Sequence, residues 1–339
     1  MHREIAVLKR RTNVVEDLCG KSPAIESLRK TIQKVAKTNS RILIEGKPGT
    51  GKEVVARLIH KQSDRSNQPF VVVNCGSLDS KKLADTLFGR EENLGRADFT
   101  VKVGLLEQAN GGTLYLDNVY DMPREVQAKF LQVLHDQKFQ RVGGKKYLDV
   151  DVRIISSSAQ PLLSAVEKKR FREDLYYRLN VVPILMPSLV MRKEDIPSLV
   201  NEFLERFCRE NTRAPLSIGT DALLFLQSYL WPGNVRQLRN VVEWMTIMAP
   251  DNASEITAEM LPAEVRQRGS ESDNSYPTNI VNLPLREARE QFERDYLTLQ
   301  INRFNGNIAR TAQTIGMERT ALHRKIKSLR IVDEDAKEA

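Results

Sequence analysis

The segment from residue 46 to residue 53 constrains the fold more than any other stretch of this sequence. It reads Gly-Lys-Pro-Gly-Thr-Gly-Lys-Glu and lies between a short apolar run, residues 41–45, and a segment with apolar residues at helical spacing. A strand, a glycine-rich loop ending in lysine, and a helix form the context of a phosphate-binding P-loop. The glycines let backbone N–H groups surround phosphates, and the helix start adds partial positive charge. The alternative is a glycine-rich turn without a ligand.

The loop predicts a bound nucleotide, ATP or ADP, with Mg²⁺. Lysine at the end of the loop would reach the outer phosphates. The strict pattern then has serine or threonine, whose hydroxyl binds the metal, whereas this sequence has glutamate. The predicted nucleotide-binding residues of the loop are Gly46, Pro48, Gly49, Thr50, Gly51, Lys52 and Glu53.

A second apolar run, residues 113–116, ends in Asp117 and Asn118. Asp117 can hold Mg²⁺ through water. The next position is normally a glutamate that polarises the attacking water, and Asn118 can bind that water but cannot take its proton. General-base assistance is typically worth ~10²–10⁴-fold. We therefore expect nucleotide binding with slow or absent hydrolysis, while the plainer interpretation of residues 114–116 is a buried strand.

Helical and strand-like stretches alternate from residue 20 to residue 187. The strand candidates are short, apolar and separated by helix-length segments: residues 41–45, 70–73, 113–116 and 150–156. This pattern predicts an α/β fold, a mostly parallel sheet with helices on both faces. Helices alone are predicted for residues 194–248, around Pro232-Gly233.

Residues 285–330 predict a small all-helical unit that ends in a helix-turn-helix. A helix-turn-helix consists of two short helices joined by a tight turn. The sequence predicts these helices at residues 307–315 and 318–329, with the turn at Gly316 and the second helix as the recognition element. Residues 285–301, which precede them, have a row of largely apolar residues on one helical face that would pack on a partner helix or within the unit. They are Leu285, Ala288, Phe292, Tyr296 and Leu299. The predicted contacts with double-stranded DNA are Arg310, Arg319, Thr320, His323, Arg324 and Lys327. A dimer would favour a palindromic site, and the alternative is a solvated basic helix.

The net charge of +8 is concentrated at the ends of the chain. Residues 285–331 carry +5, residues 1–11 carry +3 and residues 332–339 carry −3. Basic charge on the helix-turn-helix favours DNA as its partner. No apolar run is long enough for a membrane span, and the first residues do not resemble a signal peptide. Three widely spaced cysteines predict a reducing, cytoplasmic location without a disulfide or structural zinc.

Long stretches of this sequence resemble one protein family. They are GKPGTGKE at 46–53, FVVVNCGSL at 70–78, GGTLYLDN at 111–118, FREDLYYRLNVVPI at 171–184, RKEDIP at 192–197 and WPGNVRQLRN at 231–240. From about residue 18 to residue 331 the chain resembles bacterial enhancer-binding transcription regulators of the sigma-54 type. These join an AAA+ domain to a Fis-like helix-turn-helix. Residues 307–329 are most similar to the NtrX branch of nitrogen-regulation response regulators.

The resemblance implies roles for four residues outside the loop. Asn74 resembles the polar switch that senses the γ-phosphate. Arg172 and Arg178 resemble arginine fingers, which complete a neighbour's site and so imply a ring oligomer. Arg236 resembles the sensor II arginine of the helical lid. Guanidinium groups suit phosphate oxygens and stabilise a phosphoryl group during transfer.

Composition and resemblance together predict the domain division. It comprises a connecting helix at 1–19, an AAA+ α/β subdomain at 20–187, a helical lid at 188–265, a polar linker at 266–284, the Fis-like domain at 285–331 and an acidic tail at 332–339. The family places a receiver domain before residue 1, and its absence suits a shortened chain as well as a natural variant. A sensor kinase would be a partner only if the full protein has that receiver.

Three departures from the family bear on its motor activity. The GAFTGA loop is absent from residues 90–110, as the NtrX branch also tends to lack it. Asn118 replaces the usual glutamate, and Ser158-Ala159 replace the Thr-Asn of sensor I. The leading hypothesis is therefore a DNA-binding regulator whose AAA+ module binds nucleotide and sets the oligomeric state, with RNA polymerase as a further partner. The alternatives are an active sigma-54 activator ATPase and a switch that senses another nucleotide.

Overall fold

The computed structural model describes residues 18–93, 99–250, 253–268, 285–303 and 308–329. The chain divides after Pro262 into two compact units. The predicted connecting helix and acidic tail lie outside the described residues, apart from residues 18 and 19. Within the described ranges, none of the helices combines the length and apolar character that crossing a membrane requires.

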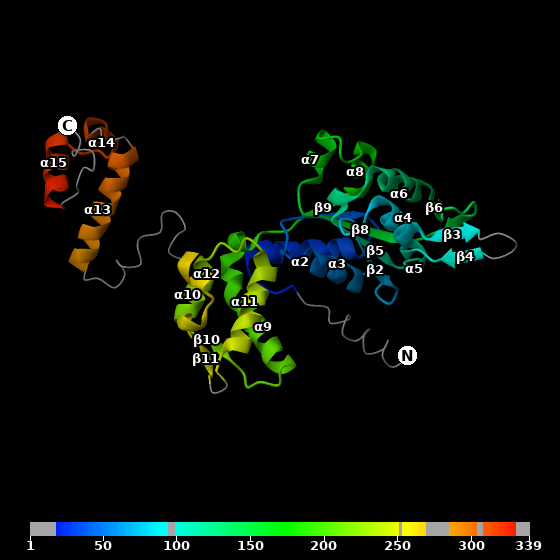
Figure 1. The fold of residues 1–339 in the computed structure, drawn as a ribbon, viewed down its shortest axis with the longest axis horizontal. Helices are drawn as coiled ribbons and strands as arrows, with labels where there is room; N and C mark the ends of the chain where they lie inside the picture. Colours follow the sequence, from blue (N-terminus) through cyan, green and yellow to red (C-terminus); the bar gives the residue numbers. More distant parts are fainter. Residues whose placement is uncertain (1–17, 94–98, 251–252, 269–284, 304–307, 330–339) are drawn as a thin grey trace. The chain divides into compact units, whose positions relative to one another are not determined.

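A five-stranded parallel sheet forms the centre of the first unit (Figure 1). Its spatial order is β2 (Phe70–Asn74), β5 (Thr113–Asp117), β8 (Arg153–Ser158), β1 (Ile42–Glu45) and β9 (Val182–Leu185). Four of these strands match the predicted ones, although β8 begins three residues later than expected. The predicted fold class is confirmed.

Helices cover both faces of this sheet because its strands are apolar on both sides. Ile42 and Ile44 of β1 pack under α2 (Pro23–Ala36) and α3 (Lys52–Lys61). The intervening Leu43 belongs to the core on the opposite face. That core is closed by α4 (Ser80–Phe88), α5 (Leu105–Gln108), α6 (Arg124–Asp136), α7 (Leu162–Glu167) and α8 (Glu173–Leu179).

The strand β9 and two hairpins were not predicted. β9 carries Pro183, which cannot donate to a ladder and is tolerated here because β9 is an edge strand. The hairpins are antiparallel and polar: β3 (Arg90–Asn93) with β4 (Phe99–Lys102), and β6 (Lys138–Gln140) with β7 (Tyr147–Asp149). Their sequences lack the apolar runs on which the strand prediction depended.

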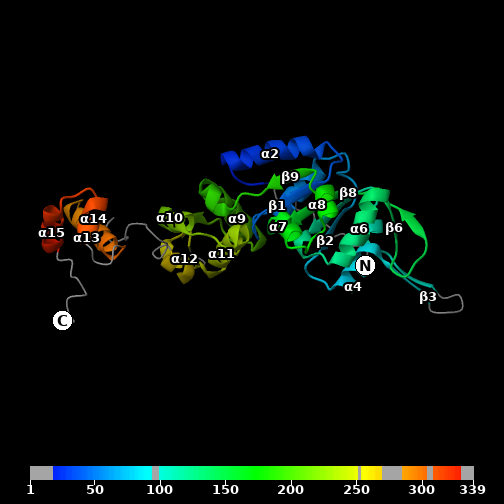
Figure 2. The same cartoon turned by 90° about the horizontal axis from the view of Figure 1, so that it is seen from above.

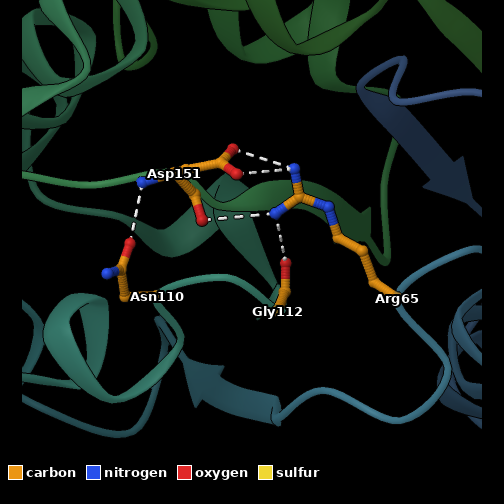
Figure 3. A network of polar contacts seen from close by, with 4 residues as sticks. All are labelled: Arg65, Asn110, Gly112 and Asp151. Atoms are coloured by element: carbon orange, nitrogen blue, oxygen red, sulfur yellow. Dashed lines mark hydrogen bonds and ion pairs between the residues drawn. The ribbon is translucent and has the colours of Figure 1, made fainter.

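Arg65 holds the starts of two central strands together (Figure 3). Its guanidinium donates to the main-chain carbonyls of Gly112 and Asp151, both at 3.2 Å, and to the Asp151 carboxylate at 2.8 and 3.1 Å. The Asn110 side-chain oxygen accepts from the Asp151 N–H at 2.8 Å. Gly112 immediately precedes β5, and Asp151 lies two residues before β8. The network therefore fixes the register of the strands whose far ends carry Asp117 and Ser158.

The rest of the first unit is a helical lid. It contains η2 (Leu189–Asp195), α9 (Ile196–Glu210), α10 (Thr220–Ser228), α11 (Asn234–Met248) and η3 (Ala258–Met260). The prediction of helices alone for residues 194–248 was wrong in one detail. A two-residue strand, β10 (Ser217–Ile218), pairs with β11 (Glu255–Ile256), which lies beyond that range.

The second unit begins with α12 (Ala263–Arg268), so the first three residues of the predicted linker are helical. Residues 269–284 lie outside the described part. Three further helices follow (Figure 2): α13 (Leu285–Arg303), α14 (Ile308–Thr314) and α15 (Arg319–Ser328). They share a small apolar core of Leu297, Ala312, Leu322 and Leu329.

Candidate functional site

The P-loop connects β1 to α3, as the sequence predicts. Gly49 and Gly51 have φ angles of +77° and +98°, a conformation that side-chain-bearing residues rarely adopt. The Thr50 hydroxyl donates to the Lys47 carbonyl at 2.8 Å and closes the turn. No side chain caps the start of α3, whose N-cap residue is Gly51. Its first N–H groups are therefore suited to an anionic ligand.

Lys52 lies at the base of this loop with a largely buried side chain. Its ammonium donates to the carbonyls of Gly46 at 2.8 Å and Lys47 at 3.3 Å. Burial lowers the pKa of Lys52, an effect that the Asp117 carboxylate opposes and the Arg236 guanidinium reinforces. A desolvated cation of this kind is stabilised by a phosphate group.

Asp117 and Asn118 follow at the carboxyl end of β5. The Asp117 Oδ1 atom accepts hydrogen bonds from the hydroxyls of Ser157 at 2.6 Å and Tyr115 at 3.2 Å. Asn118 has a left-handed backbone, with φ of +54°, and is the N-cap residue of η1 (Val119–Asp121). Asparagine tolerates this conformation better than most residues. The turn places its side chain in the same pocket as Asp117.

The lid contacts the P-loop through its backbone. The Arg236 N–H donates to the Gly49 carbonyl at 3.2 Å, and the Asn234 side chain donates to the Pro48 carbonyl at 3.0 Å. The buried Arg192 donates to the Thr50 carbonyl at 3.2 Å. These bonds place the N-terminal end of α11 against the P-loop and bring the Arg236 side chain to the site.

One pocket of about 390 Å³ contains most of the predicted nucleotide-binding residues. It is lined by Pro48, Gly49, Gly51, Lys52, Glu53, Val54, Asp117, Asn118, Asp121, Ala159, Phe203, Val235, Arg236 and Arg239. Gly46 and Thr50 shape the loop without lining the pocket. Glu53 forms an ion pair at 2.6 Å with Arg57, one helical turn later.

Sequence reasoning missed Arg239 and Asp121 in this pocket. Arg239 follows Arg236 by three positions on α11, so helical spacing could have indicated that the two share a face. Asp121 is the last residue of the short 3-10 helix η1, and a helix of three residues leaves no periodic pattern in the sequence from which it could be predicted. Ala159, which the family resemblance aligns with the second sensor I position, also lines the pocket but has no polar side chain.

Three predicted catalytic residues lie elsewhere in the unit. Asn74 is paired with Asp117 in the sheet register, yet its side chain accepts from the Gly76 N–H at 2.9 Å and does not line the pocket. Arg172 lies in a groove of about 780 Å³, where it forms an ion pair with Asp174 at 2.7 Å. Arg178 lines a separate pocket of about 390 Å³. The role of Asn74 as a γ-phosphate switch and the roles of Arg172 and Arg178 toward a neighbouring copy stay predictions.

The helix-turn-helix has the predicted geometry. Gly316 adopts φ of +71° between α14 and α15. The predicted DNA-contacting side chains on α15 and at position 310 are all exposed: Arg310, Arg319, Thr320, His323, Arg324 and Lys327. Lys325 instead pairs with Glu293 of α13 at 2.9 Å, and it holds α15 against α13. Tyr296 is 43% exposed, whereas Leu297 and Ile301 of the same helix are buried.

Comparison with known proteins gives three domain matches. Residues 18–185 match the sigma-54 interaction domain, residues 191–278 the AAA+ ATPase lid domain, and residues 288–329 the Fis family of bacterial regulatory proteins. The nitrogen assimilation regulatory protein NtrX of Azorhizobium caulinodans is 49% identical over 331 residues, which cover 97% of this chain and 72% of the relative. The chain belongs to the sigma-54-type AAA+ transcription regulators.

Within this family it is an NtrX-like DNA-binding regulator. Solved structures of NtrX from Brucella abortus, in complex with ADP and in complex with ATP, are each 51% identical to it. Each superposes with a TM-score of 0.71 over 97% of this chain and 73% of that one. In the region where many family members carry the GAFTGA loop, this regulator has the antiparallel strands β3 and β4, and residues 94–98 between them lie outside the described residues.

We predict that Gly49→Ala separates the P-loop from the lid. An added Cβ would lie 2.1 Å from the Gly233 carbonyl oxygen, in a backbone with φ of +77°. ADP affinity, measured by calorimetric titration, should fall about tenfold or more. Gly111→Ala is the matched control, because Gly111 has φ of +78° and its nearest neighbouring atom is 3.8 Å from an added Cβ. Equal losses of ADP affinity in both variants would contradict the role of the contact.

Proposed function

We propose that this regulator binds operator DNA through α15 and uses its AAA+ module as a nucleotide-dependent control of oligomerisation. In this proposal the module holds ATP or ADP, hydrolyses ATP slowly and does not remodel sigma-54 polymerase. The observation that carries the proposal is one pocket lined by Lys52, Arg236 and Asn118, with Asn118 where the family normally has a catalytic glutamate.

Nucleotide binding is supported by the convergence of cations in one pocket. Lys52 comes from the P-loop, and Arg236 and Arg239 come from α11. These groups can contact phosphate oxygens from two sides, which suits a di- or triphosphate. The related NtrX from Brucella abortus has been crystallised with both ADP and ATP.

The residues present also fit a magnesium ion. In the described part of the chain no hydrogen bond engages Asp117 Oδ2, and the carboxylate lines the pocket together with Lys52. No three His, Cys, Asp or Glu side chains gather as a metal cluster within the described ranges. Magnesium commonly keeps several waters and takes one or two carboxylates plus phosphate oxygens. Asp117 would hold it through water, and the metal would neutralise phosphate charge.

Slow hydrolysis follows from the chemistry of an amide. Asn118 can orient a water molecule through hydrogen bonds but does not accept its proton at neutral pH. Losing general-base assistance typically lowers a rate ~10²–10⁴-fold. At the second sensor I position, Ala159 offers no hydrogen-bonding side chain to the γ-phosphate. Both substitutions affect cleavage more than binding, because the cradle and the cations remain.

Two further features support control of assembly. Arg172 and Arg178 lie on α8 or at its start and do not line their own chain's pocket, so they suit contact with the nucleotide of a neighbouring copy. The polar switch proposed for Asn74 would link the γ-phosphate to the sheet edge beside Asp117. Without a GAFTGA loop, assembly would change how the protein occupies DNA rather than open a promoter. RNA polymerase would be contacted as a partner and not remodelled.

DNA binding would use the exposed face of α15. Arginine can read guanine edges with two hydrogen bonds, while lysine neutralises phosphate. Two copies joined through the small helical unit would place two such helices about 34 Å apart and favour a palindromic site.

One observation favours the alternative, an active ATPase. Asp121 lies one short turn beyond Asn118 and lines the same pocket. A carboxylate in this pocket could replace the missing base. Asp121→Asn separates the two cases, because it should abolish turnover in the alternative and leave an already slow rate unchanged in our proposal.

We predict that Asn118→Glu raises steady-state ATP turnover, by up to ~10²–10⁴-fold if the rest of the site is complete. A carboxylate at this position would take the proton from the attacking water. Phosphate release should be measured for the parent protein and the variant at equal oligomer size. Asn118→Gln is the control, since it has the length of glutamate without the base. A parent rate on the order of one per second, at the low end of ordinary enzymes, would contradict the proposal.

We also predict that Lys327→Ala weakens binding to a labelled 30-base-pair duplex and lowers the slope of log K against log salt concentration by about 1. Lys327 is exposed on the recognition helix and should neutralise one phosphate. Lys325→Ala removes the same charge two residues away, where the lysine pairs with Glu293. Fluorescence polarisation across a salt series measures both variants. An equal fall in slope for Lys325→Ala would argue against the proposed DNA-binding face.

A further inference from the structure

Ser157 lies beside the nucleotide pocket without lining it. It is fully buried in β8, which lies between β5 and β1 in the sheet. The pairing of Leu116 with Ser156 places Ser157 next to Asp117. The sequence assigns no function to this serine, since it lies within a run of three serines in a strand.

The Ser157 hydroxyl makes two hydrogen bonds with different partners. It donates to Asp117 Oδ1 at 2.6 Å and accepts from the Asn118 main-chain N–H at 3.3 Å. A hydroxyl has one donor and two acceptor sites, so both bonds can form together. The Ser157 side chain is thus bonded both to the carboxylate of Asp117 and to the main chain at the left-handed residue Asn118.

The bond to Asp117 belongs to the stronger class. Hydroxyl-to-carboxylate bonds of this length are charge-assisted and are roughly twice as strong as bonds between neutral groups. Tyr115 adds a longer bond to the same oxygen, at 3.2 Å. Two hydroxyls on Oδ1 fix the rotation of the carboxylate and leave Oδ2 for water or metal. Without Ser157, only the weaker Tyr115 bond would restrain it.

We propose that Ser157 is a positioning residue that sets Asp117 for magnesium-bound nucleotide, an inference that rests on the proposed function. Ser157 acts through Asp117, so its loss weakens the contribution of the metal to nucleotide affinity. The phosphate contacts of Lys52 and the P-loop do not depend on it. The structure therefore separates a metal-dependent part of binding from a metal-independent part.

The neighbouring serine provides a matched control. Ser156 is also fully buried in β8, and its hydroxyl donates to the Ile42 carbonyl at 3.0 Å. Ser156→Ala and Ser157→Ala each remove one buried hydroxyl from the same strand. Only the second change removes a bond to Asp117.

The experiment measures the dissociation constant of fluorescent ATP for the full chain in excess Mg²⁺ and in EDTA. For Ser157→Ala, the gain in affinity that Mg²⁺ gives should shrink about tenfold, with affinity in EDTA unchanged within about twofold. Ser156→Ala should retain the full gain. Tyr115→Phe, which removes the longer bond, should show a smaller loss and also serves if Ser157→Ala does not fold.

Three results would overturn the inference. An equal loss for Ser157→Ala in Mg²⁺ and EDTA would show a general structural effect, and an undiminished Mg²⁺ gain would show that Asp117 needs no positioning by Ser157. If Mg²⁺ does not raise the ATP affinity of the parent protein, both the inference and the metal part of the proposed function are overturned. Failure of the parent protein to bind ATP in either condition would instead refute nucleotide binding itself.

Discussion

The close approach of Gly49 to Gly233 determines how the two parts of the AAA+ module are joined. No side chain fits between these residues, so the P-loop backbone rests directly on the start of α11. The hydrogen bond from Arg236 to the Gly49 carbonyl and the bond from Asn234 to the Pro48 carbonyl depend on this contact. The side chains of Arg236 and Arg239 reach the pocket for the same reason. The lid therefore forms part of the pocket wall rather than a cover over the pocket.

The N-terminal end of the described chain is also hydrogen-bonded to the lid. Asp195, which ends η2, accepts hydrogen bonds from the main-chain N–H groups of Lys21 and Ser22 at 2.7 and 2.8 Å and from the Ser22 hydroxyl at 2.6 Å. Arg192, at a kink within η2 where the backbone is not helical, donates to the Thr50 carbonyl. The start of the described chain, the lid and the P-loop are thus connected through buried polar groups. Such groups are costly to leave unpaired, which favours their moving together.

The features of the site that prediction recovered are those expressed locally in the sequence. The run around residues 41–52 specifies a strand, a loop and a helix through glycine spacing and apolar periodicity. The placement of Arg236 came from family resemblance, because it depends on a contact between residues far apart in the chain. Strand β9 was not predicted because it contains Pro183, which a strand tolerates only at a sheet edge. Whether a strand lies at the edge depends on the arrangement of the whole sheet and cannot be read from the local sequence. The role proposed for Ser157 could not be predicted from the sequence, because adjacent strand residues face opposite ways and Ser156 and Ser157 differ only once β8 is paired with its neighbours.

In the proposed function this site binds ATP firmly but cleaves it slowly, and the fate of bound ATP tests that claim most directly. Stoichiometric ATP labelled at the γ-phosphate would be bound to the protein with Mg²⁺, then quenched at intervals and analysed as ATP and ADP. The account predicts that ATP remains bound and is converted more slowly than about once per minute, as expected when a site loses its general base. Complete conversion of bound ATP to ADP within about a second would contradict it.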